Sequence, residues 1–218
     1  MARVENLEGL LKGTTISDAD GNIYKTVTIG EQVWMAENLY TTKLNDGTPL
    51  VLASSDREWR ELEPRHGSSP YGVCWYNFDT QNKSIYGGLY NIYAAANSKL
   101  CPTGWSLPSE QDWDILIAYI GGPPEGGKLM ETGNEHWIHS DPRHVTNETG
   151  FTALPGGFIN EYGDFDELGR SGNWWGDRAS NLIVLEINEN GDIHKNNPHS
   201  GSDFGYSVRC IKGTNIQH

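Results

Sequence analysis

Hydrophobic and polar residues follow a helical period most clearly between residues 110 and 120. Ser109 is a favoured N-cap residue, and Asp112 stands three positions later, where a capping box places its acid. The Gly-Gly-Pro-Pro sequence at 121–124 ends the helix, because glycine caps its last turn and proline cannot continue it. The pattern predicts one well-bounded amphipathic helix. Four apolar residues spaced i, i+3, i+4 and i+7 line its buried face: Trp113, Leu116, Ile117 and Ile120.

Alternation with a period of two predicts the strands. Residues 182–187, LIVLEI, are apolar on nearly both faces, so we expect a strand with neighbours on both sides, followed by a turn at Asn190-Gly191. The segment 85–96 becomes helix-prone at its alanines, and a short helix is expected at 126–132. Because the helices fall in the first half and most strands in the second, the fold class is α+β. The other expected strands are 23–29 and 32–36 around a turn at Gly30, 73–76, 151–154, 157–159, one from 173, and YSVRCI at 206–211.

The length of 218 residues suits one domain, which we place at 17–213, after an N-terminal arm (1–16) and before a short tail (214–218). The net charge of −13 argues against a nucleic-acid partner and against an anionic membrane surface. No run is apolar and long enough for a membrane span. Residues 1–12 lack the features of a signal peptide, so either the protein stays inside the cell or its export signal was removed.

Three cysteines are present, and their spacing fits neither a zinc ribbon nor a redox CxxC pair. A disulfide between Cys101 and Cys210 would tie the end of the chain to its middle and close a long loop. The alternative is that both, together with Cys74, are buried thiols. The sequence alone leaves these two alternatives open.

Seven sequence blocks follow one another along the chain: DxDGNxYxTVxIGxQxWMAENL, GLYNIYAA, CPTGWSLPSEQDW, GGKLMETG, TNETGFTALPGGF, NWW and SVRCIK. Their order resembles the Fibrobacter succinogenes major paralogous domain family. The resemblance runs from about Asp18 to Lys212, and it implies an exported or surface-anchored protein with no established reaction. Within it, residues 105–113 are similar to the RLPTExEW element of sulfatase-modifying-factor-like domains, which implies a C-type-lectin-like fold: one or two main helices packed on short twisted antiparallel sheets with long loops.

The resemblance also places a binding surface near the C-terminus. In the related variable proteins of diversity-generating retroelements, this part of the fold displays the ligand-binding residues, and residues 172–204 occupy the corresponding position. Trp174 and Trp175 are adjacent, so in a strand they point to opposite faces. We expect one, Trp174 by preference, to enter the core and the other to face outward as a platform for a sugar ring or a protein anchor. Polar groups expected around it are Asp177, Arg178, Asn181, Asn196, Asn197 and His199.

These residues favour a non-catalytic, adhesin-like or receptor-like module that binds a glycan or a protein at a cell surface. The alternatives are an enzyme on the same scaffold and a structural domain of a surface assembly. The copper-holding cysteine pair of the sulfatase-modifying relatives is not reproduced, and no GxSxG, HExxH or Gly-rich phosphate loop occurs.

Metal ligands are weakly indicated. His136, His139 and His144 could gather, but surface histidines are the favoured interpretation. Asp18, Asp20 and Asn22 begin like a calcium loop, but position 29 is Ile where an EF-hand needs a bidentate Glu, so a hairpin turn is favoured. The calcium signatures of lectins are missing. We therefore expect no cofactor, although the oxygen-rich loop 160–166 could hold a structural calcium ion.

Overall fold

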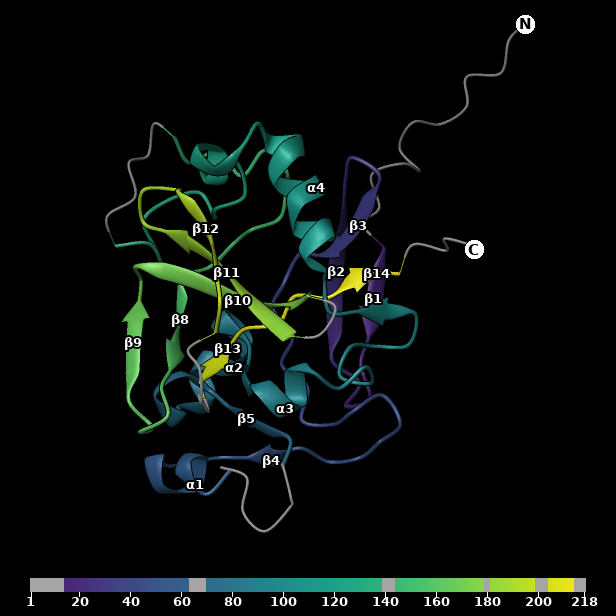
Figure 1. Ribbon diagram of the computed structural model, residues 1–218, viewed down its shortest axis with the longest axis vertical. Helices are drawn as coiled ribbons and strands as arrows, with labels where there is room; N and C mark the ends of the chain where they lie inside the picture. The colour runs from purple at the N-terminus through teal and green to yellow at the C-terminus, as the bar shows by residue number, and fades with distance from the viewer. Residues whose placement is uncertain (1–13, 63–69, 139–143, 179–180, 199–203, 214–218) are drawn as a thin grey trace, which may run out of the picture.

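Two β-sheets organise the chain in the computed structural model, which describes residues 14–62, 70–138, 144–178, 181–198 and 204–213 (Figure 1). The first and last strands of the described residues lie in the same five-stranded sheet. Residues 15 and 16, which we had placed in the arm, therefore belong to this sheet, while the rest of the proposed arm before residue 14, and the tail, lie outside the described residues. The strand order is β1 (Thr15–Ser17), β2 (Ile23–Ile29), β3 (Gln32–Met35), β14 (Ile211–Lys212) and β7 (Trp105–Ser106).

The second sheet has nine strands, and its long strands β10 and β11 are buried along nearly their whole length. Its pairings are mainly antiparallel, but β8 runs parallel to β10, and β4 runs parallel to β5. As predicted, the LIVLEI strand has a neighbour on each side. The order is β12 (Ile193–Asn196), β11 (Asn181–Asn188), β10 (Ser171–Arg178), β8 (Gly156–Ile159), β13 (Gly205–Tyr206), β6 (Leu89–Asn91), β5 (Gly72–Cys74) and β4 (Val51–Leu52), with β9 (Phe165–Leu168) on β8.

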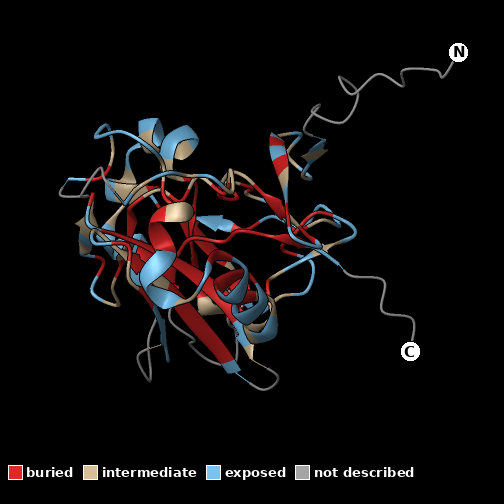
Figure 2. Cartoon of the chain, turned by 90° about the horizontal axis from the view of Figure 1, so that it is seen from above, coloured by how far each residue is buried: buried red, intermediate tan, exposed pale blue. Residues whose placement is uncertain are grey.

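The helices are short apart from α4, and they lie around the buried strands (Figure 2). The fold is therefore α+β, although strands also fill the first half of the chain. The predicted helix at 126–132 is instead a 3₁₀ segment, Pro123–Lys128. Gly126 and Gly127 pack directly on the backbone of Gly191 and His144, a contact that glycine permits and that a helix with side chains would block. The α-helices are α1 (Asp56–Arg60), α2 (Lys83–Tyr86), α3 (Ile92–Ala95) and α4 (Glu110–Ile120).

Helix α4 forms as its sequence predicts. The Ser109 side chain accepts a hydrogen bond from the Asp112 backbone N–H, and the Asp112 carboxylate accepts one from the backbone N–H of Ser109, so the capping box is complete. Gly121 ends the helix in the left-handed conformation, with φ of 107°. All four residues of the apolar stripe are buried, and the ring of Trp113 lies 4.8 Å from that of Trp34 in β3.

The closing segment YSVRCI is not the single strand that its alternation predicts. Its first residue belongs to β13 in the nine-stranded sheet, and its last belongs to β14 in the five-stranded sheet. Between them the backbone exchanges hydrogen bonds with both sides: Ser207 pairs with residues of β10, and the Val208 and Cys210 carbonyls accept from Leu39 and Met35. The segment therefore joins the two sheets. The prediction of a strand at 151–154 is also wrong, because Ala153 alone in this segment forms a β-bridge, with Met130.

Arg209, in the middle of this connector, is fully buried. Its guanidinium donates to the side-chain oxygen of Asn38 through Nε (3.0 Å) and Nη2 (2.6 Å), and to the carbonyls of Phe151 and Thr152. It also lies 4.3 Å from the centre of the Phe151 ring. The same Asn38 oxygen accepts from the indole of Trp174 at 2.8 Å. Burial lowers the pKa of Arg209, and the negative charge of Glu37 opposes this shift only in part.

Cys101 and Cys210 form a disulfide, which decides between the two alternatives for these residues. The bond joins the loop before β7 to the connector and closes a loop across 109 positions. Cys74 is a buried free thiol, and burial raises the pKa of its sulfur well above the ordinary value.

Removal of the disulfide by the double change Cys101→Ala and Cys210→Ala should lower the free energy of unfolding by about 2–5 kcal/mol, because the unfolded chain regains the freedom of a long loop. Denaturant unfolding of the oxidised protein measures this. A reductant should destabilise the natural protein and leave the double variant unchanged; equal stability of the two oxidised proteins would contradict the prediction.

Asn38→Leu should lower the free energy of unfolding by about 3 kcal/mol or more, because it leaves the buried charge of Arg209 with too few acceptors. Asn38→Asp keeps an oxygen at the same place and should destabilise less, although it loses the hydrogen bond from the Asn38 amide to the Tyr86 carbonyl. Denaturant unfolding compares the two variants, and an equal loss in both would argue that shape rather than charge decides stability here.

Candidate functional site

Trp174 and Trp175 lie on opposite faces of β10, as their adjacency predicts, but both are fully buried. The indole of Trp174 donates to Asn38, and that of Trp175 donates to the Tyr90 carbonyl at 2.7 Å. The expectation that one of them faces outward as a platform is therefore wrong. The reason is that β10 has a core cluster on each face: one includes α4, and the other includes Tyr90 and Tyr206.

Two glycines of β10 carry a signal for this double burial. A Cβ on Gly176 would lie 2.6 Å from Nε1 of Trp113, and a Cβ on Gly172 would lie 2.2 Å from the ring of Trp174. Glycine in a strand often marks the close approach of another group. The spacing of these glycines around the tryptophan pair could have indicated that aromatic rings cover the strand.

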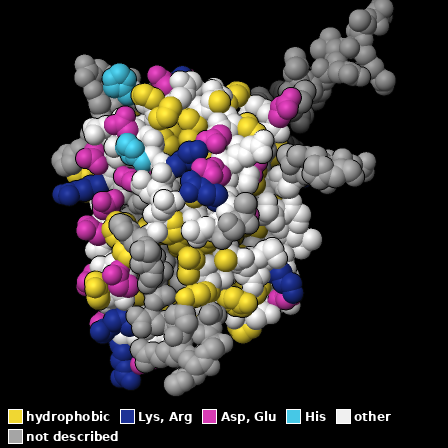
Figure 3. All heavy atoms as spheres, in the orientation of Figure 1, with side chains coloured by type: hydrophobic (Ala, Val, Ile, Leu, Met, Phe, Trp, Pro, Cys, Tyr) yellow, Lys and Arg dark blue, Asp and Glu magenta, His cyan; other side chains and the backbone are white. Residues whose placement is uncertain are grey.

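The side chains of Arg178 and Asn197 are engaged in a network of ion pairs and hydrogen bonds with α4, called the brace below, and are not free for a ligand. The guanidinium of Arg178 bonds both carboxylate oxygens of Glu110 at 2.6 and 2.7 Å and also donates to the Asn197 side chain at 2.8 Å. Lys195 of β12 joins the same group through Asp114, at 2.6 Å. These ion pairs hold the first turns of α4 against β10 and β12. Figure 3 shows basic and acidic side chains in contact on this face, above a group of hydrophobic side chains.

The other predicted ligand-binding residues do not form one site. The amide of Asn196 donates to Glu186 across the β11–β12 pair at 2.8 Å. Asp177 and Asn181, at the facing ends of β10 and β11, are exposed and line a pocket. His199 lies outside the described residues.

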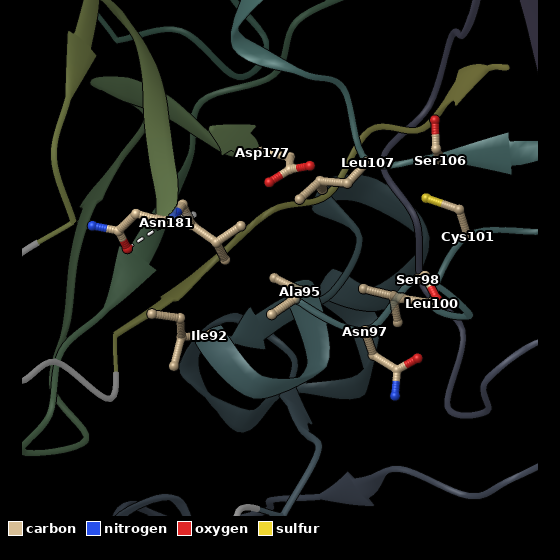
Figure 4. A pocket seen from close by; sticks show the side chains of 12 residues that line it. Ile92, Ala95, Asn97, Ser98, Leu100, Cys101, Ser106, Leu107, Asp177 and Asn181 are labelled. Atoms are coloured by element: carbon tan, nitrogen blue, oxygen red, sulfur yellow. Dashed lines mark hydrogen bonds between the residues drawn. The ribbon is translucent and has the colours of Figure 1, made fainter. Parts of the chain in front are cut away.

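This pocket has a volume of about 410 Å³. One wall comes from α3 and the loop that follows it, another from β7 and the residue after it, and the third from the ends of β10 and β11 (Figure 4). Ala95, Leu100, Cys101 and Leu182 are buried in its walls, whereas Ala96, Ser98 and the two polar residues above are exposed. The disulfide therefore lies against the pocket and ties its loop to the connector.

The side chains that point into the pocket are mostly aliphatic. In Figure 4, Ile92, Ala95, Leu100 and Leu107 face the hollow, and the carboxylate of Asp177 is directed toward it beside Leu107. The amides of Asn97 and Asn181 turn away, and the Asn181 oxygen accepts from the backbone of Leu182 at 2.9 Å. The backbone N–H of Asp177 donates to the Pro108 carbonyl at 2.8 Å, which fixes where this carboxylate stands.

Sequence reasoning found two residues of this pocket and missed its apolar wall. Ile92, Leu100 and Leu107 look like ordinary core positions in the sequence, and they come from segments distant from 172–204. Only the tertiary arrangement brings them to Asp177. A second hollow of about 360 Å³ is lined by residues that include Glu37, Asn38 and His136, and none of the predicted ligand-binding residues is among them.

The expected metal ligands are used in other ways. The carboxylate of Asp18 accepts from its own turn and from Tyr24, and that of Asp20 accepts from Thr42 and pairs with Lys43 at 3.0 Å. His136 contacts Glu131, and His139 is outside the described residues. Across the described ranges, no three His, Cys, Asp or Glu side chains are grouped as metal ligands.

The Asn160 side chain accepts from the backbone of its own loop, at Tyr162 and Asp164. This oxygen therefore stabilises the 160–166 loop through backbone hydrogen bonds. The suggestion that the loop could hold a structural calcium ion stays a prediction.

With this geometry in place, the chain can be compared with known proteins. The model of the Fibrobacter succinogenes major domain matches residues 27–212. The chain belongs to this family. The match covers the nine-stranded sheet, α4, the pocket and the five-stranded sheet from the end of β2 onward, but not β1. No curated protein and no solved structure matches the chain. In the described part of this family member, no helix has the length and apolar character needed to cross a membrane.

The brace gives a prediction about pH. Hydrogen bonds from Arg178 hold the pKa of Glu110 below its ordinary value of 4.5, so the folded state binds fewer protons than the unfolded state in this range. The stabilisation by Glu110 is therefore complete above about pH 4.5 and is lost as the pH falls through the lowered pKa. The melting temperature of Glu110→Gln should lie below that of the natural protein at pH 7, and the difference should shrink in acid and in high salt.

The control is Glu31→Gln, in the turn between β2 and β3, because Glu31 makes no ion pair with any described residue. Its melting temperature should follow that of the natural protein. A difference for Glu110→Gln that persists below pH 3 would contradict the assignment.

Proposed function

We propose that this family member is a non-catalytic binding module, adhesin-like or receptor-like, whose ligand enters the pocket between α3, β7 and the ends of β10 and β11. The observation that carries the proposal is the pocket itself. It is open, its volume of about 410 Å³ is typical of ligand sites, and it combines aliphatic walls with few polar groups. Three residues of the C-terminal segment 172–204 contribute to it: Asp177, Asn181 and Leu182.

A protein ligand is favoured over a glycan. Sugar rings are commonly held by stacking on an exposed aromatic face, and both tryptophans of β10 are buried. No aromatic side chain lines the pocket among the described residues. Its aliphatic walls are better suited to the side chain of a polypeptide.

The proposal includes a C-type-lectin-like architecture and a place at the cell surface or outside the cell. The architecture is supported by the arrangement of one main helix on twisted sheets, with the first and last strands together in the five-stranded sheet. The location is supported by the Cys101–Cys210 disulfide, because such bonds persist in oxidising compartments.

A catalytic role has less support. Burial raises the pKa of several tyrosines, and three of these, Tyr24, Tyr90 and Tyr206, belong to the core. There Tyr24 donates to Asp18, and Tyr90 donates to the Thr41 carbonyl. The pocket has a single carboxylate and no histidine among its described residues. A general acid and base pair therefore has no place there.

Membership of the retroelement variable proteins is a more specific form of the same proposal. In that case, diversified positions belong at the exposed ends of β10 and β11, such as Asp177 and Asn181. The buried tryptophans would be unsuitable, because their substitution would disrupt the core.

Ala96→Trp should block the pocket and leave the fold intact, because Ala96 is exposed at its rim. A displayed peptide library and an array of microbial and host glycans serve as the ligand screen. We expect at least one ligand to bind the natural protein, and its affinity to fall more than tenfold in Ala96→Trp.

The matched control is Gln81→Trp, which places the same side chain at an exposed position outside the pocket. Its binding should equal that of the natural protein. Ligands that bind Ala96→Trp normally would place the site elsewhere, and the lack of any ligand would favour a structural domain.

A further inference from the structure

We infer that the occupant of this pocket is a basic side chain, lysine or arginine, presented by a polypeptide partner. The inference rests on the proposed function and adds the chemistry of the ligand.

The carboxylate of Asp177 is the one charged group that lines the pocket among the described residues. It makes no ion pair or side-chain hydrogen bond with any described residue, and it points toward the hollow (Figure 4). The position is fixed by the backbone, since residue 177 is bonded to Pro108 and forms a bridge with Ser109. A carboxylate on a fixed backbone at the mouth of a cavity, without an ion-pair partner among the described residues, favours a cation.

The two basic residues that are sequence neighbours of pocket-lining residues, Lys99 and Arg178, are already paired. The ammonium of Lys99 lies 2.8 Å from Asp46, and the guanidinium of Arg178 is held by Glu110 and Asn197. The protein thus neutralises the charges on either side of the pocket and leaves Asp177 for another molecule. Asp177 thus differs from Glu110 and Asp114, the two acids of the brace, which both have cationic partners.

The walls select the rest of the ligand. Ile92, Ala95, Leu100 and Leu107 face the hollow and would contact an aliphatic stem (Figure 4). Lysine and arginine combine such a stem with a charged head, and they bury the stem along apolar surfaces. A neutral apolar group in the pocket would remove water from the Asp177 carboxylate without offering it a hydrogen bond or a positive charge, which is unfavourable. An anion would be repelled by the same carboxylate.

The rim and the net charge favour a polypeptide. Ser98 and Asn181 are exposed there, and the amide of Asn181 points outward, where a bound backbone could accept a hydrogen bond. The net charge of −13 attracts basic proteins over a distance and speeds their association. A partner with an exposed lysine or arginine on a loop fits these features.

The test uses the full chain and three blocked peptides, acetyl-Gly-X-Gly-amide, in which X is lysine, norleucine or glutamate. Titration is followed by the backbone NMR signals of residues 92–100, 177 and 182. The lysine peptide should shift these signals and bind at least fivefold more tightly than the norleucine peptide. Added salt should weaken its binding, because the interaction is electrostatic.

Asp177→Asn should lower the affinity for the lysine peptide about fivefold or more, since it removes the charge and keeps the shape. Glu31→Gln removes one negative charge, as Asp177→Asn does, but in the turn between β2 and β3. This control should bind the lysine peptide as tightly as the natural protein does. Equal binding of the lysine and norleucine peptides, or an unchanged affinity in Asp177→Asn, would overturn the inference.

The outcome is distinct from that of the proposed function. The screen could yield a ligand whose binding is lost in Ala96→Trp but unchanged in Asp177→Asn. That result would refute the inference of a basic side chain and would support the proposed binding pocket. The free diamine 1,5-diaminopentane is a further probe. If it binds more tightly than the lysine peptide, the ligand is a small amine and the polypeptide partner is refuted.

Discussion

The buried guanidinium of Arg209 is the interaction on which the two sheets depend. Desolvating an arginine costs several kcal/mol unless its donors are satisfied, and here they are satisfied by groups from separate parts of the chain. Asn38 follows β3, Phe151 and Thr152 precede β8, and Arg209 itself lies between β13 and β14. The charge therefore finds its acceptors only when all three segments are in place. This requirement selects one arrangement of the sheets over others that would bury similar apolar area.

The pocket inherits its geometry from this arrangement. The connector that carries Arg209 also carries Cys210, whose disulfide holds the loop of Cys101 against the pocket wall. Strand β10 is fixed by its buried tryptophans, one of which shares Asn38 with Arg209. Asp177 follows at the end of that strand. An exposed carboxylate thus stands on a rigid support, which reduces the ordering that a ligand would have to impose.

Local patterns in the sequence predicted the elements that depend on local physics. The capped helix α4, the hairpin around Gly30 and the strand at 182–187 all follow from side-chain period, capping and turn chemistry. The sequence failed where two distant segments meet. Alternation in YSVRCI indicates an extended backbone, but it cannot show that the two ends lie in different sheets. In the same way, adjacent tryptophans predict opposite faces, and only the packing on both sides of β10 shows that both are buried.

The disulfide has a mechanical consequence. Because Cys210 lies close to the end of β14, tension applied at the C-terminal strand passes through a covalent bond to residue 101 and bypasses the strands between them. The 109 positions enclosed by the bond cannot be pulled out as an extended chain, which withholds a contour length of roughly 390 Å. A domain pulled from this side would yield under load only by releasing segments before residue 101, which include the N-terminal strands and the α3 wall of the pocket. The pocket walls from β7, β10 and β11 stay inside the covalently closed part.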